Sequence, residues 1–173
     1  MIESMPTFAL SISYWLHMIA TVIWLGGLAT IALFVLPFIQ KTIPPDDRER
    51  LLSGLQMFLI PVGWFCLFIL IATGMFQMSA HPLYQGFLAI DNAWAVALFV
   101  KHIIIVLMVT AMGFMTWFVI PGLKRLALKQ KLGKDICLSE LIKYRKQEKT
   151  ILWINLILAL FVLIFTAWAR SVS

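Results

Sequence analysis

Four long apolar runs constrain this chain more than any other feature, because each reaches the roughly 20 residues that an α-helix needs to cross a bilayer. They cover about residues 8–38, 55–78, 93–120 and 151–169. Hydrophobic residues make up 62% of the chain and charged residues only 13%, which excludes a soluble domain with a polar surface. We therefore expect an all-α integral membrane protein, with residues 1–173 forming one domain, a bundle of four transmembrane helices.

Lysine and arginine predict the orientation of this bundle. The link after the first helix holds Lys41, Arg48 and Arg50, and the link at residues 122–149 holds nine more basic residues, whereas the opposite side has only Arg170. The positive-inside rule then places both termini and the 79–92 loop outside the cytoplasm. We expect a multi-pass protein of a bacterial or archaeal cytoplasmic (inner) membrane, whose first helix is retained because MIESMPTF lacks the basic start of a signal peptide.

The net charge of +6 is explained by this topology together with attraction to anionic lipid, so we expect no nucleic-acid partner. The basic link at residues 122–149 has two interpretations. One is a face that lies along the inner leaflet and binds anionic lipid, and the other is a solvated run of charges that only fixes the topology. The sequence leaves both open.

Three ionisable side chains lie inside the apolar runs: His17, Lys101 and His102. A lysine in a membrane helix costs on the order of 2.5 to 3.5 kcal/mol, so such residues indicate a site. His17 precedes Pro37 by twenty residues and His102 precedes Pro121 by nineteen, and both helices descend in the same direction. We therefore expect the two histidines at matching depth in the outer half of the bundle, facing each other.

Lys101 and His102 are neighbours on one helix, so their side chains point about 100° apart and only one is expected to face the bundle axis. In the first helix, Gly26 and Gly27 remove side-chain bulk, which would let a neighbouring helix or a flat cofactor approach. The alternative for His17 is a neutral imidazole that hydrogen-bonds inside the bundle and only fixes helix packing.

A second group of residues lies at the outer end of the second helix, where Met75, Met78 and His81 are spaced three apart. Thioether and imidazole together suit the soft ion Cu(I). A methionine stripe is also common in ordinary helix packing, so packing is the competing interpretation.

The residues from His17 to Pro37, HMIATVIWLGGLATIALFVLP, resemble the first helix of the CopD family of copper-resistance membrane proteins. The Thr73-Gly74 pair, Lys101 and the exit at Pro121 are similar to the same family, so the resemblance covers nearly the whole chain. It implies a role in copper uptake from the periplasm, in copper tolerance or in copper delivery.

His17 and Lys101 are also similar in position to residues of a related four-helix family, the HemJ-type protoporphyrinogen oxidases, which bind haem b. This chain reads GGLATIALF where that family shows a tyrosine and an arginine after its first-helix glycine. The resemblance therefore implies haem binding more than protoporphyrinogen oxidation, with His102 as an additional candidate ligand.

Three functions follow as hypotheses. The first is a copper protein that takes Cu(I) through Met75, Met78 and His81 and passes it to His17 and His102. The second is a haem b redox protein in which His17, with His102 or Lys101, ligates iron and exchanges electrons with a quinone or a tetrapyrrole. The third is an accessory subunit of a membrane complex. Expected partners are the bilayer, a periplasmic copper carrier or a quinone, with a homo-oligomer left open.

Overall fold

The computed structural model describes residues 7–86, 90–132 and 137–172, and these residues form helices and short connections without any strand. The elements are α1 (Thr7–Thr30), η1 (Ile31–Val35), α2 (Leu36–Thr42), α3 (Pro45–Ser79), α4 (Ala93–Phe114), η2 (Met115–Val119), α5 (Ile120–Lys131) and α6 (Leu138–Ser171). Four continuous helical stretches are long and apolar enough to cross a membrane: Thr7–Thr42, Arg50–Ser79, Ala93–Gln130 and Leu138–Ser171. The prediction of an all-α fold with four helices of spanning length is confirmed.

The helices are longer than the apolar runs that predict them. The first and third runs end near Pro37 and Pro121, yet the helix continues beyond both prolines, to Thr42 and to Lys131. A proline lacks an N–H donor and its ring collides with the carbonyl four residues earlier, which normally kinks or ends a helix. Here a π-helical turn precedes each proline, η1 in one helix and η2 in the other. The wider turn accommodates the proline without ending the helix.

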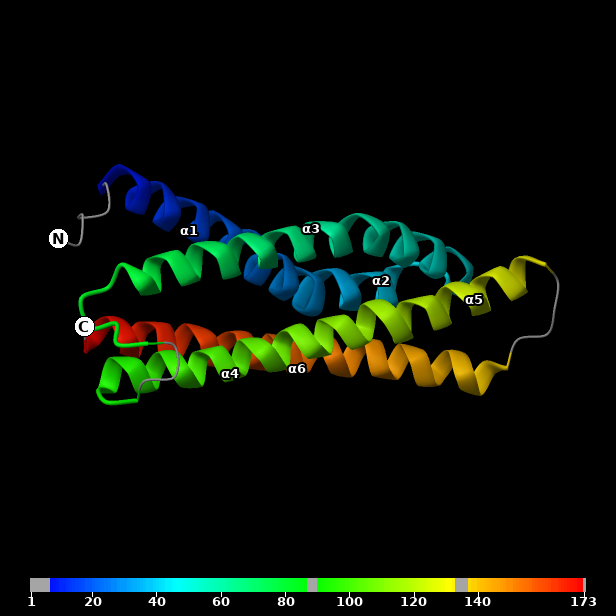
Figure 1. Cartoon of the computed structure of the whole chain (residues 1–173). Coiled ribbons are helices and arrows are strands. Elements are labelled where there is room, and N and C mark those ends of the chain that lie inside the picture. Colours follow the sequence, from blue (N-terminus) through cyan, green and yellow to red (C-terminus); the bar gives the residue numbers. More distant parts are fainter. Residues whose placement is uncertain (1–6, 87–89, 133–136, 173) are drawn as a thin grey trace.

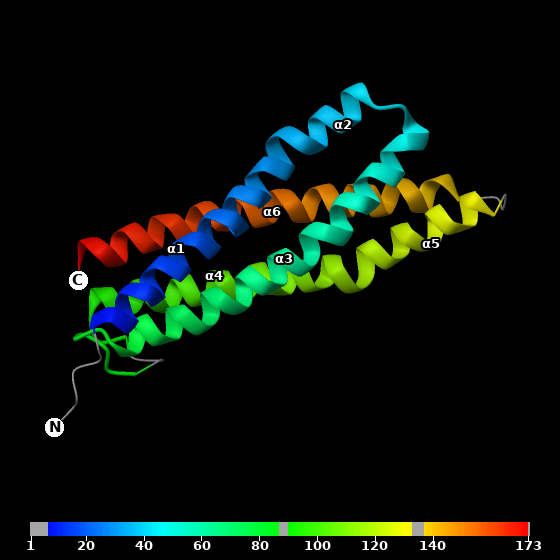
Figure 2. The ribbon, with the colours of Figure 1, turned by 90° about the horizontal axis from the view of Figure 1, so that it is seen from above.

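The long helices form two pairs. The α1–η1–α2 helix packs on α3, the α4–η2–α5 helix packs on α6, and the two pairs lie over each other as two layers (Figure 1). The view from above shows that α2 and α3 diverge toward the connection between them (Figure 2). The start of α1, the α3–α4 connection and the end of α6 lie at one end of the bundle, here called the termini end. The α2–α3 connection, the end of α5 and the start of α6 lie at the other.

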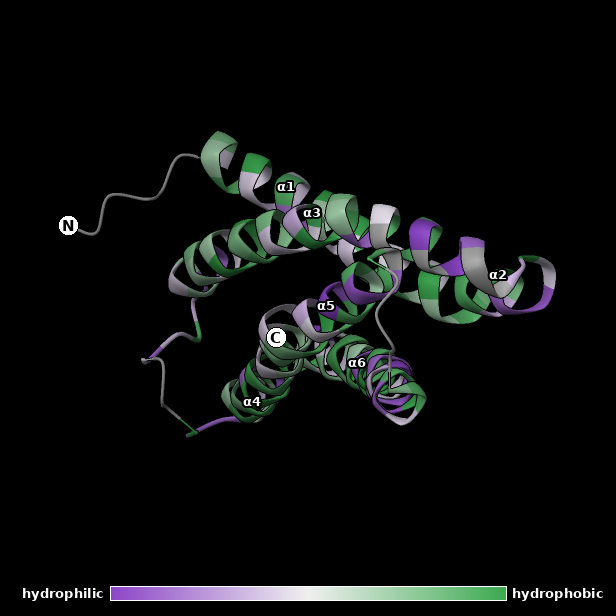
Figure 3. Ribbon diagram, turned by 90° about the vertical axis from the view of Figure 1, so that its right-hand side faces the viewer, coloured by the Kyte–Doolittle hydropathy of each residue, from purple (hydrophilic) through white to green (hydrophobic). Residues whose placement is uncertain are grey.

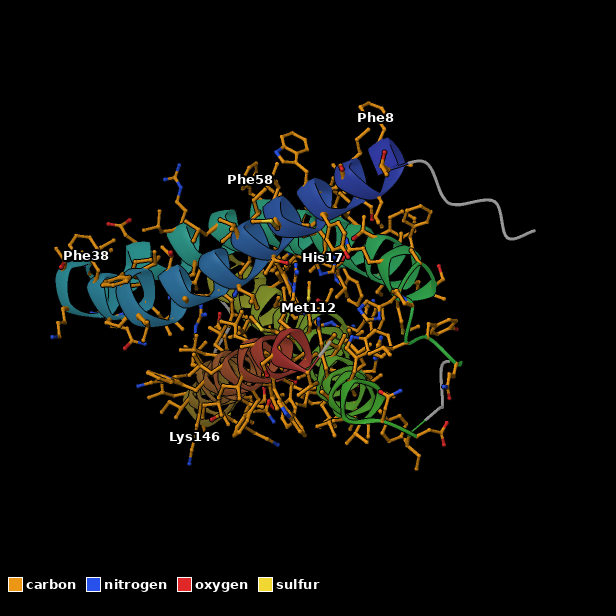
Figure 4. All side chains as sticks on the ribbon, turned by 90° about the vertical axis from the view of Figure 1, so that its left-hand side faces the viewer. Phe8, His17, Phe38, Phe58, Met112 and Lys146 are labelled. Atoms are coloured by element: carbon orange, nitrogen blue, oxygen red, sulfur yellow. The ribbon has the colours of Figure 1, made fainter. Side chains whose placement is uncertain are left out.

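Hydrophilic residues gather at this second end, on α2, α5 and the adjoining part of α6 (Figure 3). We call it the basic end because it carries the lysines and arginines of both links. Between the two ends the surface is apolar, and large side chains such as Phe8, Phe38 and Phe58 point away from the bundle (Figure 4). A surface of this kind suits contact with lipid hydrocarbon and does not suit water.

Small clusters of buried side chains hold the layers together. Near the termini end, Met78 of α3 packs with Trp94 and Ala97 of α4 and with Ala169 of α6. In the middle, Ile104 and Met108 of α4 pack with Ala159 of α6, and Trp24 of α1 lies against them. Towards the basic end, Leu36 and Ile39 meet Leu52 and Leu152. The core is divided along the bundle, which leaves room for polar groups and for a cavity between these clusters.

Candidate functional site

The imidazole of His17 is oriented by a threonine of the neighbouring helix. His17 Nδ1 lies 2.8 Å from Thr73 Oγ1 of α3, and Thr73 Oγ1 in turn lies 2.6 Å from the carbonyl oxygen of Ile69. A carbonyl oxygen can only accept, so the hydroxyl donates its proton to Ile69 and accepts from the ring. His17 therefore carries its proton on Nδ1 when neutral, and the lone pair for a metal or another partner is on Nε2.

Further polar contacts fix the same seam between α1 and α3. Gln77 Nε2 donates to the Ser13 carbonyl oxygen at 3.0 Å and lies 3.3 Å from Ser13 Oγ, which is 3.4 Å from the Thr73 carbonyl oxygen. Ser13 lies four residues before His17 on α1, and Gln77 lies four residues after Thr73 on α3, so the second pair of polar residues is one helical turn away from the first pair. At Gly74 a Cβ would lie 3.5 Å from His17 Cε1, in van der Waals contact. The ring therefore packs closely on α3.

Lys101 enters this site from the second pair of helices. It is half-buried on α4, and its charge acts on His17 across the gap between the pairs. Figure 4 places His17 and Met112 in the space between the two layers. Lys101, the neighbour of His102 in the sequence, is thus close enough to His17 for its charge to affect the imidazole.

His102 has the same protonation pattern as His17. Its Nδ1 lies 2.7 Å from the carbonyl oxygen of Leu98, one turn earlier on α4, so Nδ1 carries a proton that it donates. In the neutral ring the remaining lone pair is on Nε2. The expectation that His102 and His17 face each other across the bundle stays a prediction.

The methionines of the outer group have different surroundings. Met78 is 9% exposed and belongs to the packed cluster at the termini end, whereas Met75 is 54% exposed on the apolar surface. The packing interpretation therefore accounts for Met78 in this conformation. Among the described residues there is no group of three or more His, Cys, Asp or Glu side chains that could hold a metal ion.

His81, the third member of that group, is held at the mouth of the bundle. Its ring stacks on Trp94 with centroids 4.2 Å apart, and its Nδ1 accepts a hydrogen bond of 3.3 Å from the Leu83 backbone N–H. Burial, and to a lesser extent the charge of Arg170, lowers the pKa of His81 below its ordinary 6.5. The ring is therefore neutral at pH 7, with its proton on Nε2.

Sequence reasoning did not find a second polar group of residues, nearer the basic end. Glu148 of α6 is only 3% exposed, and it accepts hydrogen bonds from Gln56 of α3 and from Arg145 one turn before it. Glu148 belongs to the charged run KYRKQEK, which looks uniformly solvent-exposed in the sequence. The available signal was the seven-residue step from Glu148 to Asn155, which places both on one helix face.

Comparison of this chain with known protein families, with curated proteins and with solved structures finds no match. The resemblances to the CopD and HemJ-type families therefore stay predictions, and the site has to be judged on its own geometry.

Proposed function

We propose that this chain is a multi-pass membrane protein of copper handling, in which His17 is the central ligand of a site between the two helix pairs. The observation that carries the proposal is the hydrogen bond from His17 Nδ1 to Thr73. Metal-binding histidines almost always donate their other ring N–H in this way, which fixes the tautomer and the direction of the lone pair. Imidazole is a good ligand for copper, and the resemblance to the CopD family points to the same metal.

His102 is the proposed second nitrogen ligand, and Lys101 the residue that controls the charge of the site. The ammonium group of Lys101 acts on His17, so it also repels a cation bound there. Binding of Cu(I) between the two imidazoles is then stronger when the positive charge of Lys101 is removed. Met75, Met78 and His81 would act earlier, as weak ligands at the termini end, once Met78 leaves its packed cluster and His81 Nδ1 gives up the hydrogen bond from Leu83.

The orientation belongs to the same proposal. The basic end lies in the cytoplasm of a bacterial or archaeal cell, and the termini end faces outward. His17 is ten residues into α1 from its first residue, Thr7, so the site lies in the outer half of the bundle. Copper would reach it from the periplasmic side, directly or from a carrier protein. The basic end would bind anionic lipid.

One observation favours a second candidate, a haem b redox protein. Both His17 and His102 donate a hydrogen bond through Nδ1. Neutral imidazoles with this hydrogen-bonding pattern also suit the axial ligation of haem iron. In that case Lys101 is an alternative axial ligand, as the HemJ resemblance implies, and its loss would weaken binding.

The sign of the effect of Lys101→Met separates the two candidates. We would titrate the purified protein in lipid nanodiscs with Cu(I), in competition with a chromophoric chelator. The copper proposal predicts that His17→Ala and His102→Ala lose at least tenfold in affinity, whereas Lys101→Met binds as tightly as the wild type or more tightly. Equal losses in His17→Ala and Lys101→Met would overturn the assignment of His102 as partner, and full retention in His17→Ala would overturn the copper site.

A further inference from the structure

A cavity lies between the two helix pairs, on the basic-end side of His17. It has a volume of about 170 Å³, and all four long helices contribute to its walls. The walls are mainly apolar side chains, among them Trp24, Leu28, Leu59, Met112 and Leu152. A cavity of about 150 Å³ with similar walls is large enough for benzene. A single six-membered ring is therefore the size of ligand that fits.

Two of the polar side chains at this cavity have oxygens that can accept further hydrogen bonds. Glu148 lines it together with Gln56, whose amide donates to Glu148 Oε1 at 2.5 Å. Arg145 Nη1 donates to Glu148 Oε2 at 2.5 Å, so the charge of the carboxylate is compensated and no cation is needed to balance it. A carboxylate has about four lone-pair positions, which leaves Glu148 with capacity to accept further hydrogen bonds.

Asn155 supplies the second acceptor. Its side chain is part of the cavity wall and only 4% exposed, and its Oδ1 accepts no hydrogen bond from any residue that the structure describes. A buried amide oxygen without a donor costs about 1 to 3 kcal/mol. Asn155 follows Glu148 by two helical turns on the same face, which separates them by about 10 Å at 1.5 Å per residue. The cavity thus offers two acceptors at opposite ends of an apolar wall.

We propose that this cavity binds the head of a lipid-soluble hydroquinone, a neutral ring with a hydroxyl group at each end. Two para hydroxyl groups, each extended by one hydrogen bond, span on the order of 11 Å, which is similar to the rise of about 10 Å between the backbone positions of Glu148 and Asn155 along α6. The oxidised quinone carries only acceptors and cannot donate to either residue. These two oxygen acceptors therefore favour the reduced form over the oxidised one.

An adjoining groove accommodates the apolar tail. It lies between the α1–η1–α2 helix and α3, has a volume of about 950 Å³, and shares Gly27, Ile31 and Leu55 with the walls of the cavity. Its outer part includes Leu51 and Phe58, which are 41% and 70% exposed on the apolar surface. The groove lies where α2 and α3 diverge (Figure 2), and its exposed apolar residues would meet the lipid from which a ligand enters.

Two glycines of α1 give a matched pair of variants for the test. At Gly26 and at Gly27 a Cβ would meet no atom within 4 Å, but only Gly27 lines the cavity and the groove. Gly27→Leu should fill the space that the ligand needs without a clash inside the protein. Gly26→Leu adds the same side chain to the exposed side of the helix and is the control.

The experiment measures the binding of 2-decyl-1,4-hydroquinone, kept reduced under anaerobic conditions, to the protein in nanodiscs. The amount retained by empty nanodiscs is subtracted. Its dimethyl ether, which has no hydroxyl donors, is the matched ligand. We expect saturable binding of the hydroquinone, about tenfold weaker binding of the ether, and loss of that difference in Asn155→Leu. Gly27→Leu should abolish binding and Gly26→Leu should retain it.

Equal retention of hydroquinone and ether would show a non-specific apolar space and overturn the proposal. So would the absence of saturable binding, which would mean that water alone satisfies Asn155. Binding of hydroquinone by Asn155→Leu as tight as by the wild type would contradict the role of the Asn155 amide as a hydrogen-bond acceptor for the ligand. His17→Ala should leave hydroquinone binding unchanged, so failure here and failure of the copper proposal are distinguishable.

Discussion

Replacing Thr73 with valine tests the orientation of His17 without touching the ligand itself. Valine keeps the β-branched shape of threonine but removes the hydroxyl that accepts from His17 Nδ1 at 2.8 Å. The ring then loses the partner that fixes its tautomer, and a proton on Nε2 would block the metal lone pair. Losses of this kind weaken metal binding about 10- to 100-fold. This corresponds to about 1.4 to 2.8 kcal/mol of binding free energy.

The assay is the Cu(I) competition titration in nanodiscs, with Thr21→Val as the matched control. Thr21 Oγ1 donates to the backbone carbonyl oxygen of His17 at 2.7 Å, so its loss removes a threonine hydroxyl next to the same residue without affecting the ring. Thr21→Val should bind copper as the wild type does. Wild-type affinity in Thr73→Val, or an equal loss in both valine variants, would refute the argument that the Thr73 hydroxyl orients the ligand.

Three other predictions concern topology, acid and packing. Cys137 is exposed near the basic end, whereas Cys66 is buried, and hydrogen bonds from Ser139 and the neighbouring backbone lower the pKa of the Cys137 thiol. A membrane-impermeant maleimide should therefore label Cys137 in inverted vesicles but not in intact cells. Labelling of intact cells would contradict the proposed orientation. Burial lowers the pKa of His81, so below about pH 6.5 the unfolded chain binds more protons than the folded protein. Thermal stability should therefore fall as the pH drops below about 6.5, and His81→Gln should make this fall less steep. An unchanged pH dependence in His81→Gln would show that other groups cause it. Gly122→Ala would place a Cβ 2.5 Å from the Tyr144 ring, so it should lower the free energy of unfolding by about 1 to 3 kcal/mol. Thermal or denaturant unfolding measures this change. A gain in stability would contradict the close packing of α5 on α6.

The four helices were predictable because a run of about 20 apolar residues has few other stable solutions. Their ends were not. The first and third apolar runs end next to Pro37 and Pro121, but a π-turn before each proline lets the helix continue into the polar end segments. Whether a proline ends a helix depends on the local backbone around it, which hydropathy does not describe.

Part of the candidate site was predictable on grounds of energy. Ionisable groups in apolar helices are costly, which singled out His17 and Lys101, and the charge of Lys101 does act on His17. Thr73 appeared only through the family resemblance, because a threonine in a helix usually bonds back to its own turn. Thr73 does that as well, and the additional hydrogen bond to His17 depends on how α1 and α3 pack.

Glu148 shows why the second polar group was missed. In the sequence it lies among basic residues that are expected to face water, and its neighbours Lys146 and Lys149 are indeed exposed. Only the folded bundle brings Glu148 of α6 within hydrogen-bonding distance of Gln56 of α3 and buries it. The paired glycines Gly26 and Gly27 are a related case, because the sequence suggested a closely approaching helix or cofactor and the structure leaves open space beside both.

The most direct test of the central claim, a metal site centred on His17, is an absorption spectrum of the detergent-purified protein in its oxidised and dithionite-reduced states, with copper and iron quantified on the same sample. A copper site at His17 predicts a protein without a Soret band that retains copper and loses it in His17→Ala. A Soret band with about one iron per chain would contradict the copper proposal and identify His17, with His102 or Lys101, as a ligand of haem b. Copper retained in full by His17→Ala would contradict the site itself.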